Sequence, residues 1–370
     1  MNTINKIFSV LILFTFYPSE ISAQNIVPLD TTNWNINARS YVLENYKGKD
    51  AIYLQGGGIT LKDTEFLNGI IEFDIYLKEV SGFPGVYFRI RDGKDGEQWY
   101  IRPHLSGKPD ANQAAPLING VSPWQLNFGK KYSFPYKYKY DDWTHVKLVV
   151  KNDKAQVFLD HSEKPNLSWN LFTEIKAGEI MIRGGGMQAM HIANIEITHE
   201  EPELVNFNPL TRKPIPNLVP TWEVSDAFAE KELDNLKNLK TLIGARKWKG
   251  TISVEEGIAA NISRKIQLQG IAANTVFTKI IIHSDKNRQK LFHFGYSDRV
   301  VAILNGKTIY KGTNRWRSRD YRYLGTIGLF DGIYLNLKKG ENELLMAVSE
   351  DFGGWLITGK FEDLDGIKLK

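Results

Sequence analysis

Residues 85–91 read Gly-Val-Tyr-Phe-Arg-Ile-Arg, and residues 99–104 read Trp-Tyr-Ile-Arg-Pro-His. Both stretches alternate between apolar and polar side chains, and a turn-rich segment at 92–96 separates them. Because successive side chains of a strand point to opposite faces, the pattern predicts two paired strands with one apolar face. The opposite face is expected to carry Tyr87, Arg89, Tyr100, Arg102 and His104.

This polar face predicts a ligand site. Arginine offers bidentate hydrogen bonds, and histidine changes charge near neutral pH, which suits a polar or anionic ligand such as a sugar. The loop that follows adds Asp110, Asn112, Gln113 and Trp124 for hydrogen bonding and for stacking on a sugar ring. The predicted ligand-binding residues are Tyr87, Arg89, Tyr100, Arg102, His104, Gln113 and Trp124. The alternative is an ordinary exposed sheet face whose arginines pair with Glu72, Asp74 and Glu97.

Short alternating segments with frequent turns recur over residues 30–198 and again from residue 251 onward. Asn305-Gly306 is a strong hairpin signal, because both central residues of a type I′ turn need a positive φ. Many short strands and no long helix predict antiparallel sandwiches, and a length of 370 residues favours two domains.

Two segments separate these halves. Five prolines between residues 200 and 220 indicate a semi-rigid linker, and a short helix is expected from Ser225 to Leu242. The predicted fold class is all-β, with two antiparallel β-sandwich (jelly-roll) domains joined by a Pro-rich linker and a short helix. The expected boundaries are a signal peptide over 1–24, sandwiches over 25–200 and 246–370, and the linker with its helix over 201–245.

The first half resembles a known family. The hairpin of residues 142–150 and 155–160, with its Trp-x-His-Val-Lys start, resembles that of concanavalin A-like and laminin G-like jelly rolls. Residues 84–89 are also similar to a strand of bacterial 3-keto-disaccharide hydrolase domains, which share this sandwich. The resemblance implies the fold for most of residues 30–198. It leaves the activity open, since lectins, glucanases and lyases all use this fold.

The second half resembles a galactose-binding-like jelly roll. The similarity rests on residues 298–306, 337–344 and 353–355 and covers roughly 250–368. Sandwiches of this type are accessory sugar-binding domains in many β-galactosidase-like glycosidases. The resemblance implies an accessory β-sandwich, with or without a sugar of its own.

Four residues are candidates for catalysis. Glu72 and Asp74 lie two apart on a predicted strand and share a face, and glycoside hydrolysis uses paired carboxylates. Laminarinase-like glucanases place a third acid shortly afterwards, which this chain lacks before Glu79. His104 or Glu97 as a base, with Arg89 and Arg102 as anchors, would suit a hydrolase or lyase.

The sequence predicts no cofactor and no metal centre. The chain has no cysteine, and its histidines lack the spacing of a zinc site. A structural calcium ion remains open, because the loop at residues 92–96 half resembles a calcium loop.

The N-terminus and the charge bear on location and partners. Lys6, the apolar run 7–16 and Ala23 form the pattern of a cleaved export signal, and no later segment is long and apolar enough to span a membrane. The net charge of +5 comes without a lysine or arginine block, so nucleic acid is not an expected partner.

The sequence thus predicts an exported, periplasmic or secreted protein that recognises carbohydrate and takes part in glycan binding or breakdown. One alternative is a glycoside hydrolase or a keto-sugar hydrolase or lyase. A second alternative is a structural surface module with no small ligand.

Overall fold

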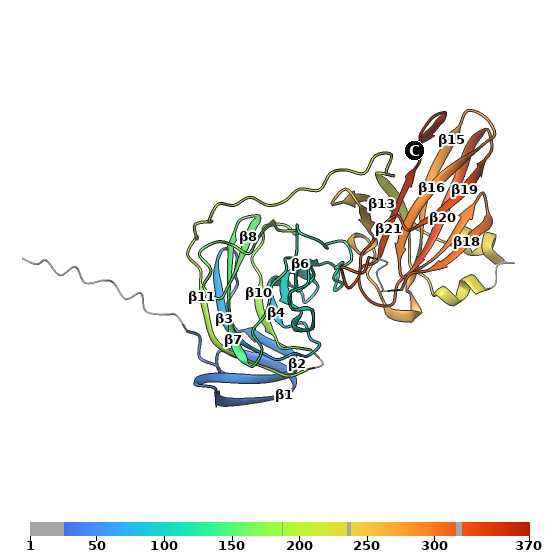
Figure 1. Ribbon diagram of the computed structural model, residues 1–370. Helices are drawn as coiled ribbons and strands as arrows, with labels where there is room; N and C mark the ends of the chain where they lie inside the picture. Colours follow the sequence, from blue (N-terminus) through green and yellow to red (C-terminus); the bar gives the residue numbers. More distant parts are fainter. Residues whose placement is uncertain (1–25, 187, 235–237, 316–319) are drawn as a thin grey trace, which may run out of the picture.

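The computed structural model describes residues 26–186, 188–234, 238–315 and 320–370. The predicted signal peptide lies outside these ranges. The described residues form two antiparallel sheets of eleven strands each, one in each half of the chain (Figure 1). The predicted all-β class with two sandwiches is therefore confirmed. Within the described ranges, no helix is long and apolar enough to cross a membrane.

The first sheet curls around one apolar core. Its strand order is β6-β5-β4-β10-β2-β11-β3-β7-β8-β9, with β1 paired to β2 off this path. Its core contains Phe88 and Trp99, as the alternation predicts. The strands are β1 (Trp34–Tyr46), β2 (Lys49–Leu61), β3 (Gly69–Leu77), β4 (Gly85–Arg91), β5 (Asp95–Ile101), β6 (Asn112–Leu117), β7 (Asp142–Lys151), β8 (Lys154–Leu159), β9 (Leu167–Asn170), β10 (Glu179–Arg183) and β11 (Met190–Thr198).

The second sheet encloses a separate core. Its order is β18-β17-β20-β15-β12-β13-β14-β21-β16-β19, with β22 paired to β15. The predicted hairpin at Asn305-Gly306 joins β17 to β18 with φ values of 49° and 78°, as a type I′ turn requires. The strands are β12 (Thr221–Ser225), β13 (Trp248–Glu255), β14 (Ala259–Asn261), β15 (Thr275–Ser284), β16 (Arg288–Ser297), β17 (Arg299–Leu304), β18 (Lys307–Thr313), β19 (Asp331–Leu337), β20 (Gly340–Ser349), β21 (Leu356–Phe361) and β22 (Ile367–Leu369).

The helix between the sandwiches is shorter than the sequence predicts. Ser225 ends strand β12, and its hydroxyl accepts a hydrogen bond from Phe277 N, so it does not cap a helix. A 3₁₀ turn over Glu230–Asp234 and the helix α1 (Leu239–Gly244) follow. The predicted helix therefore extends too far toward the N-terminus, and the second sheet already begins within the segment assigned to the linker.

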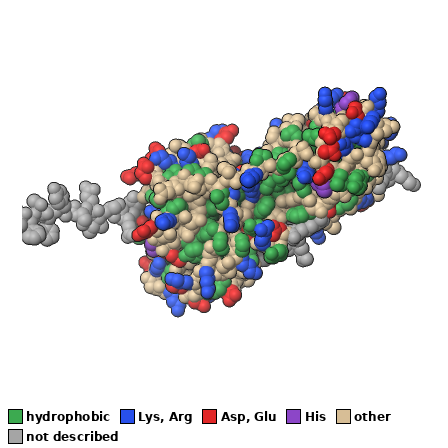
Figure 2. Space-filling view, turned by 45° about the horizontal axis from the view of Figure 1, so that its top comes forward, with side chains coloured by type: hydrophobic (Ala, Val, Ile, Leu, Met, Phe, Trp, Pro, Cys, Tyr) green, Lys and Arg blue, Asp and Glu red, His purple; other side chains and the backbone are tan. Residues whose placement is uncertain are grey.

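The two sandwiches are docked side by side (Figure 1). Gln125 of the first sandwich hydrogen-bonds Ser297 Oγ and Gly354 N of the second at 3.1 and 2.7 Å. A small apolar cluster at the junction contains Leu126 and Leu356, one from each sandwich. On the face shown in Figure 2, acidic and basic side chains are interspersed over both lobes.

Candidate functional site

A cavity of about 360 Å³ lies at the junction of the two sandwiches. The first sandwich supplies a polar floor from β4, β5 and the residue after β5, and a wall from β10, and the second sandwich supplies part of the rim. The lining residues are Phe83, Tyr87, Gln98, Tyr100, Arg102, Leu117, Gly120, Val121, Ser122, Trp124, Arg183, Leu268, Leu324, Asp351, Phe352 and Gly353. The cavity therefore includes four of the predicted ligand-binding residues, Tyr87, Tyr100, Arg102 and Trp124.

The floor is a hydrogen-bonded unit. Tyr100 Oη donates to Gln113 Oε1 at 2.7 Å and accepts from Arg102 Nη2 at 3.0 Å. Gln113 in turn donates from Nε2 to the carbonyl oxygens of Trp124 and Asn127 at 2.7 and 2.6 Å. Burial raises the pKa of Tyr100 to about 12, so this phenol stays protonated at physiological pH. Gln113 holds the floor together and does not itself line the cavity.

The charge of Arg102 is neutralised by a buried ion pair with Asp110. Arg102 Nη1 lies 2.6 Å from Asp110 Oδ1, and both side chains are almost fully buried. Asp110 also accepts a hydrogen bond from Leu324 N of the second sandwich at 2.8 Å. Burial raises the pKa of Asp110, although Arg102 opposes the shift. The pair therefore fixes the floor to the second sandwich.

Arg183 completes the wall, although it is not among the ligand-binding residues predicted from the sequence. Its Nη1 donates to Tyr87 Oη at 2.8 Å, because β10 pairs with β4 and sets Arg183 opposite Gly85. The alternation of residues 179–183 could have indicated that Arg183 is on a polar face, because it places Arg183 opposite the buried Ile180 and Ile182. That β10 lies beside β4 could not be inferred from this alternation.

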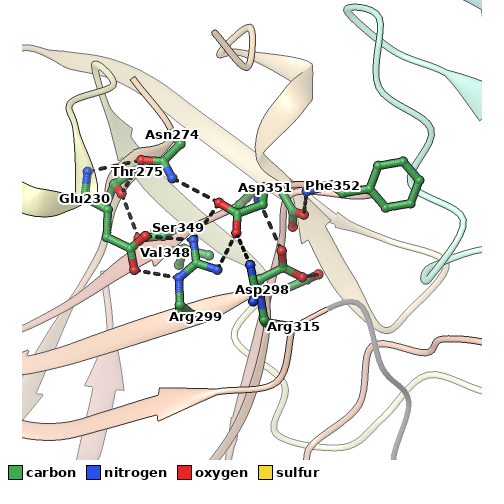
Figure 3. A network of polar contacts seen from close by, with 12 residues as sticks. Glu230, Asn274, Thr275, Asp298, Arg299, Arg315, Val348, Ser349, Asp351 and Phe352 are labelled. Carbon is green, nitrogen blue, oxygen red and sulfur yellow. Dashed lines mark hydrogen bonds and ion pairs between the residues drawn. The ribbon is translucent and has the colours of Figure 1, made fainter. Parts of the chain in front are cut away.

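The rim contributed by the second sandwich carries an aromatic side chain. Phe352 is 67% exposed although it borders the cavity. The neighbouring Asp351 carboxylate is bound by Arg299 at 2.7 and 2.8 Å and by Arg315 at 3.0 Å. These contacts, Arg299 foremost, lower the pKa of Asp351 to about 2. Figure 3 shows the Phe352 ring pointing away from this network.

The structure corrects the expectation for Arg89. A bulge shifts the register of β4 between Phe88 and Arg91, and Arg89 has a φ of 53°. The side chain is fully buried and donates to the carbonyl oxygens of Leu67, at 2.8 Å from Nε, and of Asn152, at 2.7 Å from Nη2. Arg89 therefore does not share the face of Tyr87, because a bulge breaks the period of two on which that expectation relied.

His104 and Glu97 lie outside the cavity lining. His104 belongs to a 3₁₀ turn, not to a strand, and its ring packs at 5.6 Å against that of Phe83. Burial, together with Arg102, lowers the pKa of His104. Glu97 is buried, where its Oε1 accepts hydrogen bonds from the backbone and hydroxyl of Thr173. Burial outweighs these bonds and raises the pKa of Glu97 to about 7.

Glu72 and Asp74 lie on one face of β3, as the spacing predicts, but not at the cavity. Both hold His145 of β7: Asp74 Oδ1 lies 2.8 Å from Nδ1, and Glu72 Oε2 lies 3.1 Å from Nε2. Asp74 also accepts from Lys49 and Asn194 at 2.7 Å each. The two acids thus join a polar network of lysine and histidine, whereas the sequence alternative paired them with arginines.

No candidate metal site is present among the residues that the structure describes. None of them form a group of three or more His, Cys, Asp or Glu side chains that could hold a metal ion.

Comparison with known proteins gives matches among solved structures alone. No family model and no curated protein matches the chain. A putative glycosyl hydrolase from Parabacteroides distasonis has a TM-score of 0.32 at 13% identity, covering 46% of this chain and 90% of its own. The carbohydrate-binding module CBM66 from Bacillus subtilis has a TM-score of 0.35 at 15% identity, covering 45% and 94%.

A third solved structure is domain 4 of the arabinanase AbnA from Geobacillus stearothermophilus, in complex with arabinotriose. Its TM-score is 0.28 at 13% identity, and the match covers 43% of this chain and 77% of that one. Similarity this low assigns no function to the chain. The function is therefore inferred from the geometry of the cavity.

Proposed function

We propose that this protein is exported and binds carbohydrate in the cavity between its two sandwiches. The observation that carries the proposal is the composition of that cavity. Hydrogen-bonding side chains of the first sandwich form the floor, and aromatic side chains of both sandwiches, Trp124 and Phe352, border it. A sugar needs both, because its hydroxyl groups require fixed polar partners and its carbon–hydrogen faces pack on aromatic rings. A volume of about 360 Å³ suits one or two sugar rings.

Binding is better supported than hydrolysis. Glycoside hydrolysis commonly uses two carboxyl groups on either side of the scissile bond. Among the described residues that line the cavity, Asp351 is the acidic one, and its carboxylate is engaged by Arg299 and Arg315. The candidate bases of the hydrolase alternative, His104 and Glu97, do not border the cavity. The proposed role is therefore recognition.

The test is Phe352→Ala, measured by isothermal titration calorimetry against oligosaccharides selected from a glycan array with the full chain. We expect a loss of affinity of about tenfold, roughly 1.4 kcal/mol, because the ring closes one side of the cavity. The side chain is 67% exposed, so its removal costs the fold little.

The matched control is Tyr334→Ala. Tyr334 is 65% exposed and lies on β19, away from the junction. Equal affinities for the two variants would contradict the proposed site. If no glycan binds the full chain at all, carbohydrate recognition is wrong.

A further inference from the structure

Of the described charged side chains that border the cavity, Arg102 and Asp351 are neutralised by ion pairs and Arg183 is not. Arg102 is neutralised by Asp110 at 2.6 Å, deep below the floor. Asp351 is neutralised by Arg299 and Arg315 on its other side (Figure 3). Arg183 has no acidic side chain within ion-pair distance among the described residues. Within the part of the chain that the structure describes, it is therefore a cation of the cavity wall without a counter-charge.

The polar contact of Arg183 leaves much of its guanidinium available. The acceptor that the described residues offer is the phenol oxygen of Tyr87, 2.8 Å from Nη1. That contact fixes one nitrogen, and the guanidinium lies over the Tyr87 ring with its central carbon 6.0 Å from the centroid. The remaining donors of a guanidinium held in this way can form the paired hydrogen bonds that a carboxylate accepts.

The position of Arg183 is fixed by its strand. β10 is hydrogen-bonded on one side to β2 and on the other to β4, with Arg183 opposite Gly58 and Gly85. A side chain at Gly85 would collide with Tyr100, because a Cβ there would lie 2.5 Å from Tyr100 Cα. The glycine thus allows the close approach of β4 and β5 beneath the arginine. Strand pairing fixes the backbone of Arg183, and the Tyr87 contact holds one of its nitrogens, so part of the ordering that anion binding needs is already in place.

Not every unpaired donor near the cavity is open to a ligand. Arg102 Nε has no acceptor among the described residues, but it is buried, so a ligand in the cavity does not reach it. Trp124 borders the cavity, and Gly353 packs closely on it, since a Cβ at Gly353 would lie 2.9 Å from Trp124 Nε1. The donors that an anion in the cavity could use are therefore those of Arg183, of which one nitrogen is engaged by Tyr87.

We infer that the cavity selects an acidic sugar, with the carboxylate of a hexuronate or a sulfate ester bound by Arg183. The inference rests on the proposed function and adds the chemical class of the ligand. In this arrangement Arg183 anchors the anionic group, Tyr87 orients the guanidinium, and the sugar ring packs between Trp124 and Phe352. Arg102, which the sequence favoured as an anchor, is instead a neutralised part of the floor.

The test compares matched sugars on the full chain by isothermal titration calorimetry. The probes are a hexuronate-terminated disaccharide, its neutral hexose counterpart and a sulfated hexose disaccharide. We expect an acidic sugar to bind at least tenfold more tightly than the neutral one at low salt, with the preference shrinking as salt rises. The uronate and sulfate arms distinguish the two sources of the anion.

The decisive variant is Arg183→Gln. It is expected to abolish the preference for the acidic sugar and to retain the weak binding of the neutral one. The control is Arg91→Gln on β4, because Arg91 is also half-buried on a strand but borders a different depression of the surface. It should leave the preference unchanged.

Two outcomes overturn the inference in different ways. Equal affinity of the full chain for acidic and neutral sugars, or an Arg183→Gln variant that keeps the preference, contradicts the acidic-sugar assignment and leaves the proposed function standing. If none of the three sugars binds and the glycan array is also negative, the proposed function fails and the inference fails with it.

Discussion

At the scale of single residues, His145 shows how the polar outer face of β3 and β7 is stabilised. Its two ring nitrogens lie 2.8 Å from Asp74 Oδ1 and 3.1 Å from Glu72 Oε2. Burial disfavours the imidazolium, but the two carboxylates outweigh it and raise the pKa of His145 to about 9. The histidine therefore stays charged at neutral pH and is one cation of an ion-pair network that also includes Lys49 and Lys147.

This geometry predicts a pH-dependent stability. A raised pKa in the folded state contributes stability that is complete below the unfolded value of about 6.5 and is lost as pH rises through about 9. We expect His145→Gln to remove roughly 1–2 kcal/mol at pH 6, a figure reduced for solvent screening of the carboxylates, and almost nothing at pH 10. Urea unfolding at both pH values measures the difference.

The control for this prediction is His283→Gln, at an exposed position on β15 where no described acidic side chain lies within ion-pair distance. It should retain the wild-type dependence of stability on pH. A His145→Gln protein whose stability still declines between pH 6.5 and 9 as the wild type does would show that the network does not hold the proton.

At the scale of elements, the bulge in β4 decides which arginine reaches the cavity. The extra residue turns Arg89 into the protein, where it binds the carbonyl oxygens of Leu67 and Asn152. We expect Arg89→Met to lower the free energy of unfolding by roughly 2–5 kcal/mol, because it leaves two carbonyl oxygens without their donor. Sugar affinity per folded molecule should not change.

Thermal unfolding and calorimetry on the same preparation test both parts of this expectation. Arg91→Met is the comparison, since Arg91 is half-buried and makes one weak hydrogen bond, at 3.4 Å, to Glu174 O. If Arg89→Met were as stable as Arg91→Met, the assigned structural role of Arg89 would be wrong. If a folded Arg89→Met protein lost sugar binding, Arg89 would be a ligand-binding residue after all.

The elements also show what the sequence could and could not predict. Alternation correctly assigned Val86 and Trp99 to the core and Tyr87 and Tyr100 to the opposite face, because these residues lie in regular strand. It failed for Arg89, since a bulge is set by local geometry that a period of two does not contain. The Asn305-Gly306 turn was predictable because its two positive φ angles favour those residue types.

At the scale of the whole molecule, the candidate site belongs to neither sandwich alone. Arg183, Leu268 and Phe352 are far apart in the sequence and meet because the sandwiches dock. The periodicity of a single segment does not indicate which distant segments become neighbours. The sequence could therefore predict the polar floor but not the wall or the rim. Docking thus turns a polar sheet face into a cavity.

Gln125 couples the two sandwiches without lining the cavity. Its amide spans the junction, accepting from Gly354 N at 2.7 Å and donating to Ser297 Oγ at 3.1 Å. The same loop of the second sandwich carries Phe352, whose backbone N–H is bound by Glu350 at 2.8 Å. The position of the aromatic rim therefore depends on a residue of the first sandwich.

Gln125→Ala is expected to weaken sugar binding several-fold although no wall residue is changed. Loss of the amide leaves Gly354 N without its acceptor, at a cost of roughly 1–3 kcal/mol, and releases the loop that carries Phe352. The control is Lys131→Met, which removes an ion pair of 2.6 Å to Glu256 across the same junction, because neither residue lines the cavity. Calorimetry should find near-wild-type affinity for the control and reduced affinity for Gln125→Ala. Equal affinities would mean that the first sandwich binds the ligand unaided, because the rim position would then not matter.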